Sequence, residues 1–514
     1  MSFSNLTVLV ALASTAACYI LWKNKRSDID SLLPPKAPGY IPIIGHILEL
    51  IRPIPIHELF CKWSLQVGPV FTCYFGTQKW IVINSIEAVR DLIVERGTIY
   101  SSRNLPDTII QDIFQGDKGG SFAFMTYGPR WRHLRRIAHS GLIKNKVDLY
   151  QPILNERRTA LLSYIYKLSE EKKEKDKGID ISYFIEHYTM TSILTIAFGD
   201  ICSFEPEDPT LHKAFNLTER ASKALSPGDQ VREFFPILQM LWPAEKTRYF
   251  QLRDDIVQFY ETLLNQFRAQ KSTQDCFVKE IMKENELNDL QIIYFVALFV
   301  GAGSDTTAST IEWAISYLAN HPEVQDLAYN EIKEEVGLDR LPQSYDESNL
   351  PFVQCIILET LRIRPPAPTA IPHATSEDDV YKGWHIPKNT VILMNLFAIH
   401  NNPSRFPNPS QFQPERHLEY VQESQHNHKF SQVIEDRPHL GFSTGRRVCV
   451  GIHLAERKLF MAISMLLACF KIERISEDLI DVNAHKDIHG VTWAIPHYKI
   501  QLVPRHDKVE TFFK

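Results

Sequence analysis

The sequence lacks several patterns that would assign a protein of this length to a class directly. None of the 8 cysteines among the 514 residues falls in a Cys-x-x-Cys pair, so neither a cysteine zinc site nor a disulfide framework is indicated. We therefore expect reduced, mostly buried thiols in a cytosol-facing protein. A net charge of −5 provides no basic excess, which argues against a nucleic-acid partner. Internal repeats and low-complexity tracts are also absent.

Long charge-free apolar runs are rare, and the clearest one lies at residues 6–22. It spans about 17 residues, the short end of the range for a membrane-spanning helix. Lys23 begins a basic stretch directly after it, so the positive-inside rule predicts a membrane anchor at 1–22 with the rest of the chain in the cytosol. A cleaved signal peptide is the alternative, because residues 13–17 are small, but the expected basic segment before the run is missing.

Residues 23–45 are expected to form a basic, proline-rich linker, since Pro34, Pro35 and Pro38 disfavour helix and stiffen the chain. Residues 46–514 are predicted to form one large body that is mainly α with a small β region. Two strands joined by a turn are expected at residues 70–84. Helices are expected at 131–139, 152–168, 181–198, 248–269, 323–336 and 452–468, with further strands at 370–374, at 391–395 and near the C-terminus.

The longest predicted helix runs from Asp289 to Asn320, about 48 Å at 1.5 Å per residue. Asn288 could cap it together with Gln291, and Pro322 stops it. Its middle reads Ala-Gly-Ser-Asp-Thr-Thr at 302–307, which places glycine and polar groups in an apolar helix. A polar face turned to solvent would explain this, but a local rule broken inside a strong element more often indicates function.

A cysteine lies directly before the predicted helix at 452–468. The segment 442–451 reads Phe-Ser-Thr-Gly-Arg-Arg-Val-Cys-Val-Gly. At the start of a helix, free N–H groups and the helix dipole favour a thiolate at Cys449. Gly445 and Gly451 would permit a tight loop and the close approach of a flat ligand. On these grounds alone, a metal ligand and a structural thiol both remain open.

The same segment resembles the haem-binding signature of the cytochrome P450 family, Phe-x-x-Gly-x-Arg-x-Cys-x-Gly, at every fixed position. Three further motifs of that family occur in the right order: Ala-Gly-x-Asp-Thr-Thr at 302–307, Glu-x-x-Arg at 359–362 and Pro-Glu-Arg at 414–416. The chain resembles microsomal eukaryotic members, including those of fungal type. It departs from many of them at His417, where they have phenylalanine; we expect this to affect only packing.

The resemblance implies a cytochrome P450 fold with a single N-terminal transmembrane helix, and haem b (iron protoporphyrin IX) with Cys449 as the axial ligand of the iron. Trp131 and Arg135, one helical turn apart, would reach a propionate, although they could also stack on a surface helix. His373 would reach the other propionate, or would be an ordinary loop histidine. The implied cofactor-binding residues are Trp131, Arg135, His373, Phe442, Gly445, Arg447, Cys449 and Gly451.

The resemblance also assigns catalytic and supporting roles. Thr306 would hydrogen-bond the dioxygen and Asp305 would help to deliver protons, beside a helix kink and a notch at Gly303. Glu359, Arg362 and Arg416 would form a buried supporting triad. An apolar substrate pocket is expected, although some of its residues could be plain core. The named pocket residues are Phe122, Phe124, Phe299, Ala302, Ile371 and Trp493.

The function implied is a monooxygenase that hydroxylates a lipophilic steroid, terpenoid, polyketide or xenobiotic at the endoplasmic reticulum membrane. Because no flavin or ferredoxin sequence is present, electrons would come from an NADPH-cytochrome P450 reductase, with cytochrome b5 as a second candidate partner. Arg446, Arg457 and Lys458 could form the docking face or could be solvated charges. The alternatives are a reductase-independent isomerase or dehydratase, and a non-catalytic haem-binding protein.

Overall fold

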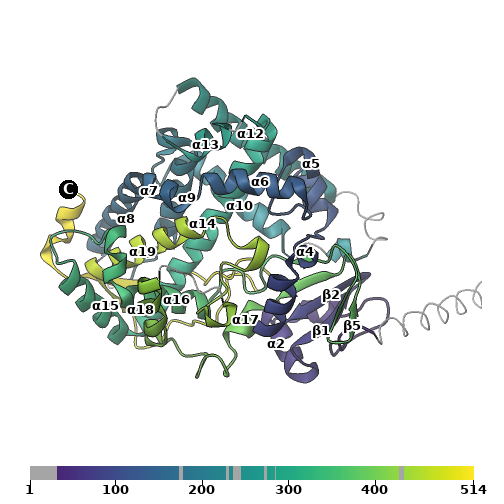
Figure 1. Cartoon of the computed structure of the whole chain (residues 1–514). Coiled ribbons are helices and arrows are strands. Elements are labelled where there is room, and N and C mark those ends of the chain that lie inside the picture. Colours follow the sequence, from purple (N-terminus) through teal and green to yellow (C-terminus); the bar gives the residue numbers. More distant parts are fainter. Residues whose placement is uncertain are drawn as a thin grey trace, which may run out of the picture.

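The computed structural model describes residues 32–172, 178–226, 231–235, 245–270, 275–283, 285–427 and 433–514. The predicted anchor at 1–22 and the first part of the linker lie outside these residues. The described chain forms a large helical body with a smaller sheet region at one side (Figure 1). The prediction of a mainly α fold with a small β region is confirmed.

The longer helices agree with the predicted ones to within a few residues at most ends. The helix predicted at 452–468 is α19, and the one predicted at 323–336 is α15. The main helices are α2 (Ile56–Val67), α6 (Pro129–Ser140), α8 (Gln151–Lys172), α9 (Ser182–Phe198), α10 (Pro209–Ala224), α12 (Glu245–Gln270), α14 (Asp289–Asn320), α15 (Pro322–Glu335), α16 (Pro351–Ile363) and α19 (Ile452–Cys469). Shorter ones include α13 (Phe277–Lys283), α17 (Leu396–His400) and α18 (Leu418–Asn427).

Helix α14 runs through the centre of the body and packs against α9 and α19 (Figure 1). The predicted capping box is present: Asn288 Oδ1 accepts from the N–H of Gln291, and Gln291 Oε1 accepts from the N–H of Asn288. Among the described residues, α14 has the length and apolarity to cross a membrane, but just over half of its most apolar stretch is buried in the protein. It is therefore a core helix.

The main sheet has the strand order β1-β2-β6-β3. β1 (Val70–Phe75) and β2 (Gln78–Ile83) form the predicted antiparallel hairpin, β6 (Val391–Met394) pairs parallel to β2, and β3 (His373–Ala374) pairs antiparallel to β6. Two further antiparallel pairs join β4 (Asp379–Tyr381) to β5 (Trp384–Ile386) in a hairpin, and β7 (Phe470–Arg474) to β8 (Ile500–Pro504) across a longer connection.

The strand predicted at 370–374 is too long. Ala370 has a positive φ of 52°, which an extended strand does not allow, and Pro372 has no N–H to donate to a neighbouring strand. Only His373 and Ala374 pair with β6.

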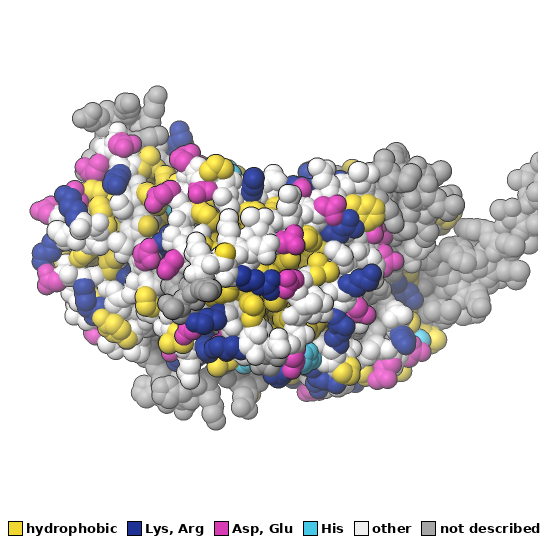
Figure 2. All heavy atoms as spheres, turned by 90° about the horizontal axis from the view of Figure 1, so that it is seen from above, with side chains coloured by type: hydrophobic (Ala, Val, Ile, Leu, Met, Phe, Trp, Pro, Cys, Tyr) yellow, Lys and Arg dark blue, Asp and Glu magenta, His cyan; other side chains and the backbone are white. Residues whose placement is uncertain are grey.

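The surface of the body carries charges of both signs. Figure 2 shows basic and acidic side chains interspersed over the face seen from above, with apolar side chains between them. This pattern agrees with the nearly balanced charge of the sequence.

Candidate functional site

An apolar cavity of about 480 Å³ lies between α14 and the loop that precedes α19. Its walls come from distant parts of the chain, including α10, the segment after Arg103, and residues 366–372. Five of the six predicted pocket residues line it: Phe122, Phe124, Phe299, Ala302 and Ile371.

Trp493, the sixth, is not among the residues that line the cavity, and this prediction is wrong. Its ring is buried and packs against His57, with the ring centroids 4.6 Å apart. The carbonyl oxygen of Trp493 accepts hydrogen bonds from Ser309 Oγ and Trp313 Nε1. The neighbours of Trp493, Val491 and Thr492, do line the cavity. The segment was therefore placed correctly, but the largest side chain on it turns into the core.

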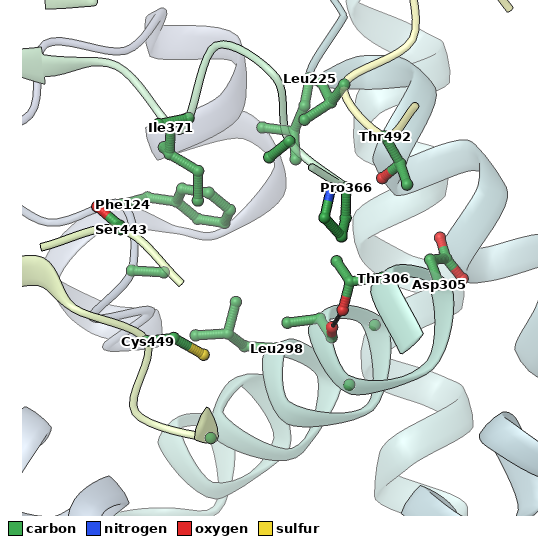
Figure 3. Close-up of a pocket in the computed structure, with 18 of the residues that line it drawn as sticks. Phe124, Leu225, Leu298, Asp305, Thr306, Pro366, Ile371, Ser443, Cys449 and Thr492 are labelled. Atoms are coloured by element: carbon green, nitrogen blue, oxygen red, sulfur yellow. Dashed lines mark hydrogen bonds between the residues drawn. The ribbon is translucent and has the colours of Figure 1, made fainter. Parts of the chain in front are cut away.

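The sulfur of Cys449 projects into the cavity from the loop before α19 (Figure 3). The N–H of Cys449 donates to the carbonyl oxygen of Phe442 over 2.9 Å, which closes the loop. Gly445 has a φ of +64°, and a Cβ there would lie 2.7 Å from the carbonyl oxygen of Ile93, so only glycine fits. A Cβ on Gly451 would meet no atom within 4 Å. The loop therefore leaves room beside the sulfur for a flat ligand.

The surroundings of Cys449 act on its thiol in opposite directions. Burial raises the pKa of the thiol, while the N–H of Gly451 and the charge of Arg135 lower it. The net direction is upward, because burial outweighs the N–H of Gly451 and the charge of Arg135. A metal ion deprotonates a thiol that binds it, and this would supply the missing stabilisation.

A group of cationic side chains lies beside the cavity. Arg447 is buried; its guanidinium donates to the carbonyl oxygens of Ser101, Phe122 and Met125 and lies 4.3 Å from the centre of the Trp131 ring. Arg135 lies over the same ring at 5.4 Å. Trp131 is 3% exposed, so it does not stack on a surface helix. Among the described residues, its Nε1 has no hydrogen-bond partner.

Arg103 belongs to the same group and was not predicted as a site residue. It is buried, lines the cavity, and donates to the carbonyl oxygens of Ile371 and Pro372 over 2.6 Å. Burial lowers the pKa of Arg103 to about 9 and that of Arg447 to about 8. Within the described part of the chain, neither of them nor Arg135 pairs with a carboxylate. Because buried cations normally have a counter-ion, these residues fit an anionic ligand such as the propionates of haem.

His373 is buried behind this wall and does not line the cavity. Its Nδ1 lies 2.7 Å from the carbonyl oxygen of Tyr100. Burial, with the nearby charges of Arg103 and Arg447, lowers the pKa of His373 well below its ordinary value. A contact between His373 and a propionate stays a prediction.

Asp305 and Thr306 both line the cavity on α14 but point in different directions. Thr306 faces Cys449 across the open space, whereas the carboxyl group of Asp305 turns away from it (Figure 3). Thr306 Oγ1 donates to the carbonyl oxygen of Ala302 over 2.7 Å. Burial and the nearby charge of Glu186 raise the pKa of Asp305 to about 7. An acid that titrates near neutral pH therefore lies next to an alcohol that faces the cavity.

Helix α14 is continuous through 302–307, and the expected kink stays a prediction. A Cβ on Gly303 would lie 2.8 Å from Ile193 Cδ1 of α9, so this glycine lets the two helices pack closely. Gly303 and Ile193 both line the cavity, and the expected notch stays a prediction.

The expected docking face also requires correction. Lys458 is 1% exposed, and its Nζ donates to the carbonyl oxygens of Thr189 and Gly303, which links α19 to α9 and α14. Arg457 is largely covered and forms an ion pair with Asp148 at 2.7 Å. Arg446 alone of the three is exposed. The sequence did not reveal this, because α9 and α14, which cover Lys458, come from distant parts of the chain.

Burial lowers the pKa of Lys458 to about 7, against about 10.4 in an unfolded chain. Between these values the unfolded state binds the additional proton, so the contribution of Lys458 to the free energy of unfolding should increase from pH 7 to pH 10. We expect the stability difference between the native protein and Lys458→Met to shift by several kcal/mol over this range. Unfolding midpoints at pH 7, 8 and 9 would measure it, with the exposed Lys333→Met as the control. A difference independent of pH would contradict the prediction.

A buried ionic cluster lies beneath the cavity, centred on Glu359 of α16. Arg362 Nε lies 2.7 Å from Glu359 Oε2, and Arg416 Nε lies 3.2 Å from Oε1. The expected triad is therefore present. His417 Nε2 also lies 2.7 Å from Glu359 Oε2, so this residue affects more than packing, contrary to expectation. Burial alone would raise the pKa of Glu359, but hydrogen bonds from Arg362 and His417 lower it to about 2.

An apolar cavity with a cysteine on one wall and cationic side chains beside it defines a haem-thiolate site, and the comparisons with known proteins agree. The cytochrome P450 family matches residues 34–502, and the chain belongs to that family. Its members are monooxygenases that bind haem b through a cysteine thiolate. The cofactor and enzyme class expected from the sequence are thereby confirmed.

The chain is 31% identical over 529 residues to cytochrome P450 monooxygenase fogE of Aspergillus ruber, covering 98% of this chain and 93% of that protein. It is 30% identical over 486 residues to (+)-piperitol/(+)-sesamin synthase CYP81Q2 of Sesamum radiatum, covering 92% of each. A zebrafish cytochrome P450 solved with progesterone superposes with a TM-score of 0.73 at 27% identity, covering 88% of this chain and all of that one.

Proposed function

We propose that this protein inserts one atom of dioxygen into a lipophilic substrate, using electrons that an NADPH-cytochrome P450 reductase supplies. The observation that carries the proposal is the arrangement of Cys449 and Thr306 on facing walls of one apolar cavity (Figure 3). Haem b bound at Cys449 would supply the oxygen-activating chemistry. The remaining steps depend on the side chains around it.

The residues have three roles under this proposal, and the first two concern the binding of haem. Cys449 would hold the iron, and the N–H groups and glycines of its loop would shape the space around the sulfur. Trp131, Arg103, Arg135 and Arg447 would bind the propionates, because an unpaired indole N–H and three guanidinium groups lie together there.

Asp305 and Thr306 would move the proton that oxygen activation requires. Burial and the charge of Glu186 raise the pKa of Asp305 to about 7, so this group can exchange a proton near neutral pH, and its carboxyl group faces away from the cavity. The hydroxyl of Thr306 would then pass the proton into the cavity. The hydrogen bond from Thr306 Oγ1 to the Ala302 carbonyl oxygen fixes the orientation of this hydroxyl.

The cavity favours a lipophilic substrate, because its walls are mostly aromatic and aliphatic. Steroids, terpenoids, polyketides and xenobiotics all meet this requirement. Solved relatives carry progesterone or abiraterone, and a curated relative is named a (+)-piperitol/(+)-sesamin synthase.

We place the protein in the endoplasmic reticulum membrane, held by residues 1–22 with the linker at 23–45 and the catalytic body in the cytosol. Cytochrome b5 is a candidate second donor, and the exposed Arg446 could contribute to docking.

The test combines the purified haem protein with reductase, NADPH and a panel of lipophilic compounds. Compounds that enter the cavity should shift the Soret band as they displace water from the iron. Products should then carry one oxygen atom from isotopically labelled dioxygen. Product formed from a peroxide without NADPH would favour the isomerase or dehydratase alternative. Haem binding without turnover of any compound that shifts the band would favour a non-catalytic protein.

Replacing Thr306 with alanine should separate NADPH consumption from product formation. The variant loses the hydroxyl that faces Cys449, so reduced oxygen should leave as peroxide, and product per NADPH should fall about tenfold or more. Simultaneous measurement of NADPH, peroxide and product would show this. Thr306→Ser keeps the hydroxyl and should stay close to the native ratio. Unchanged coupling in the alanine variant would remove Thr306 from the proton path.

A further inference from the structure

Three side chains that commonly bind metal ions meet outside the haem cavity. His57 and Glu58 lie in the first turn of α2, and His485 comes from the segment between β7 and β8. One ligand atom from each, an imidazole nitrogen or a carboxylate oxygen, lies within 4.8 Å of the other two. α2 lies beside the sheet of β1 and β2 (Figure 1), so this cluster joins the N-terminal and C-terminal parts of the fold.

Two ring nitrogens of this cluster are buried and lack a hydrogen bond within the described part of the chain. The Nε2 atoms of both His57 and His485 have no hydrogen-bond partner among the described residues. His57 is 4% exposed, and the side chain of His485 is 8% exposed. His485 Nε2 lies 3.7 Å from Glu58 Oε1, which is too long for a hydrogen bond. Buried nitrogens of this kind normally have partners, and these two lie within 4.8 Å of each other and of one carboxylate, which marks a place where a ligand fits.

Aromatic packing holds the two imidazole rings in place. The His57 ring lies 4.9 Å from Phe397 and 4.6 Å from Trp493, measured between ring centroids. The His485 ring is stacked on Trp493 at 4.9 Å with an interplanar angle of 3°. This packing fixes both rings in the positions from which they would bind a metal ion.

We propose that His57, Glu58 and His485 form a binding site for one Zn²⁺ ion. Two imidazoles and one carboxylate are a common ligand set for zinc, with a fourth position left for water. Ligand bonds of about 2.0–2.2 Å require the three atoms to move closer together, and Glu58, only partly buried, can turn toward the rings. The site is separate from Cys449 and does not depend on the oxygen chemistry.

The ligand types favour zinc over a hard cation. The Arg364 guanidinium lies 4.6 Å from the centre of the Trp493 ring, close enough for its charge to act on His57, and it opposes all cations alike. Glu58 is the one carboxylate of the cluster, so Mg²⁺ or Ca²⁺, which prefer several oxygen ligands, would gain little. Imidazole ligands suit zinc. We therefore expect Zn²⁺ to bind and Mg²⁺ not to compete.

Zinc bound at this site would restrict one wall of the substrate cavity. His485 lies on the same segment as Val491 and Thr492, which line the cavity. The N–H of Trp493 donates to the carbonyl oxygen of Pro366, another residue of the cavity wall, over 2.8 Å. Zinc would tie this segment to α2 and reduce its freedom to adjust. The affinity for a bulky cavity ligand should therefore change when zinc is bound.

The experiment uses full-length, tag-free, haem-loaded protein equilibrated with Zn²⁺ and then freed of unbound ion by gel filtration. Elemental analysis should find about one zinc ion for each haem iron in the native protein. Glu58→Gln and His485→Gln should each bind zinc at least about tenfold more weakly, since loss even of outer partners costs metal sites that much. His497→Gln, which alters an exposed histidine of the same segment, should bind zinc like the native protein.

Three results would overturn the proposal. The native protein could retain no zinc, Mg²⁺ could displace it, or Glu58→Gln and His485→Gln could retain as much zinc as His497→Gln. The last result would place the ion on surface histidines. Haem content and the spectrum of the reduced carbon monoxide complex report whether each variant is folded. Both Glu58 and His485 lie outside the haem cavity, so these signals should match those of the native protein.

Discussion

Replacing Cys449 with serine should remove the long-wavelength band of the reduced carbon monoxide complex, which is characteristic of haem bound through sulfur. Product formation should fall by about a thousandfold or more, equivalent to over about 4 kcal/mol of transition-state stabilisation. The reason is that Cys449 is the one cysteine among the described residues that lines the cavity. A serine hydroxyl lacks the electron donation of a thiolate.

The matched control is Cys61→Ser, which changes a half-buried cysteine of α2 outside the cavity. It should keep both the band and the activity. Haem content must be measured alongside, so that loss of the band is scored only in haem-loaded protein. A Cys449→Ser variant that retained the long-wavelength band would show that another residue binds the iron, and the assignment of the site would be wrong.

Replacing Glu359 with glutamine should lower the free energy of unfolding by about 3–5 kcal/mol, the cost of leaving a buried charge without its partner. Glu359 and Arg362 are both fully buried, with 0% exposure. The neutral amide would leave the Arg362 charge facing only carbonyl oxygens, among them those of His400 and Pro409. Denaturant unfolding followed by loss of the haem signal would measure the change.

The ion pair of Glu359 and Arg362 also predicts how the free energy of unfolding depends on pH. The pKa of Glu359 is lowered to about 2 in the folded protein, against about 4.3 in an unfolded chain. The stabilisation is therefore complete above about pH 4.3 and disappears as the pH falls toward 2, a span worth about 3 kcal/mol. Glu359→Gln should lose less stability than the native protein over this range.

Glu415→Gln is the control for both measurements, because Glu415 is exposed and close to the cluster in the sequence. It should change the free energy of unfolding by no more than about 0.5 kcal/mol, as surface substitutions usually do. If the two glutamine variants unfolded at the same denaturant concentration, the ionic cluster of Glu359 would not stabilise the fold.

The sequence could predict the structural features that residues close together in the chain form with one another. The capping box of Asn288 and Gln291, the hairpin of β1 and β2 and the ion pair of Glu359 with Arg362 all join residues close in sequence. The tight loop before α19 belongs to the same class, because Gly445 and Cys449 lie within one short segment. Local backbone geometry and helical spacing specify such features.

Features that depend on distant partners required the tertiary structure. Arg103 became a site residue only because residues 371 and 372 fold over it, and Lys458 became a core residue because α9 and α14 surround it. His417 contacts a carboxylate 58 positions away.

The proposed zinc ligands show the same division, since His57 and His485 come from opposite parts of the chain. The sequence by itself determined which chemistry this protein carries, through the cysteine loop and the polar stretch of α14. The packing of distant segments decided which side chains surround that chemistry, because burial and long-range contacts leave no local pattern in a sequence.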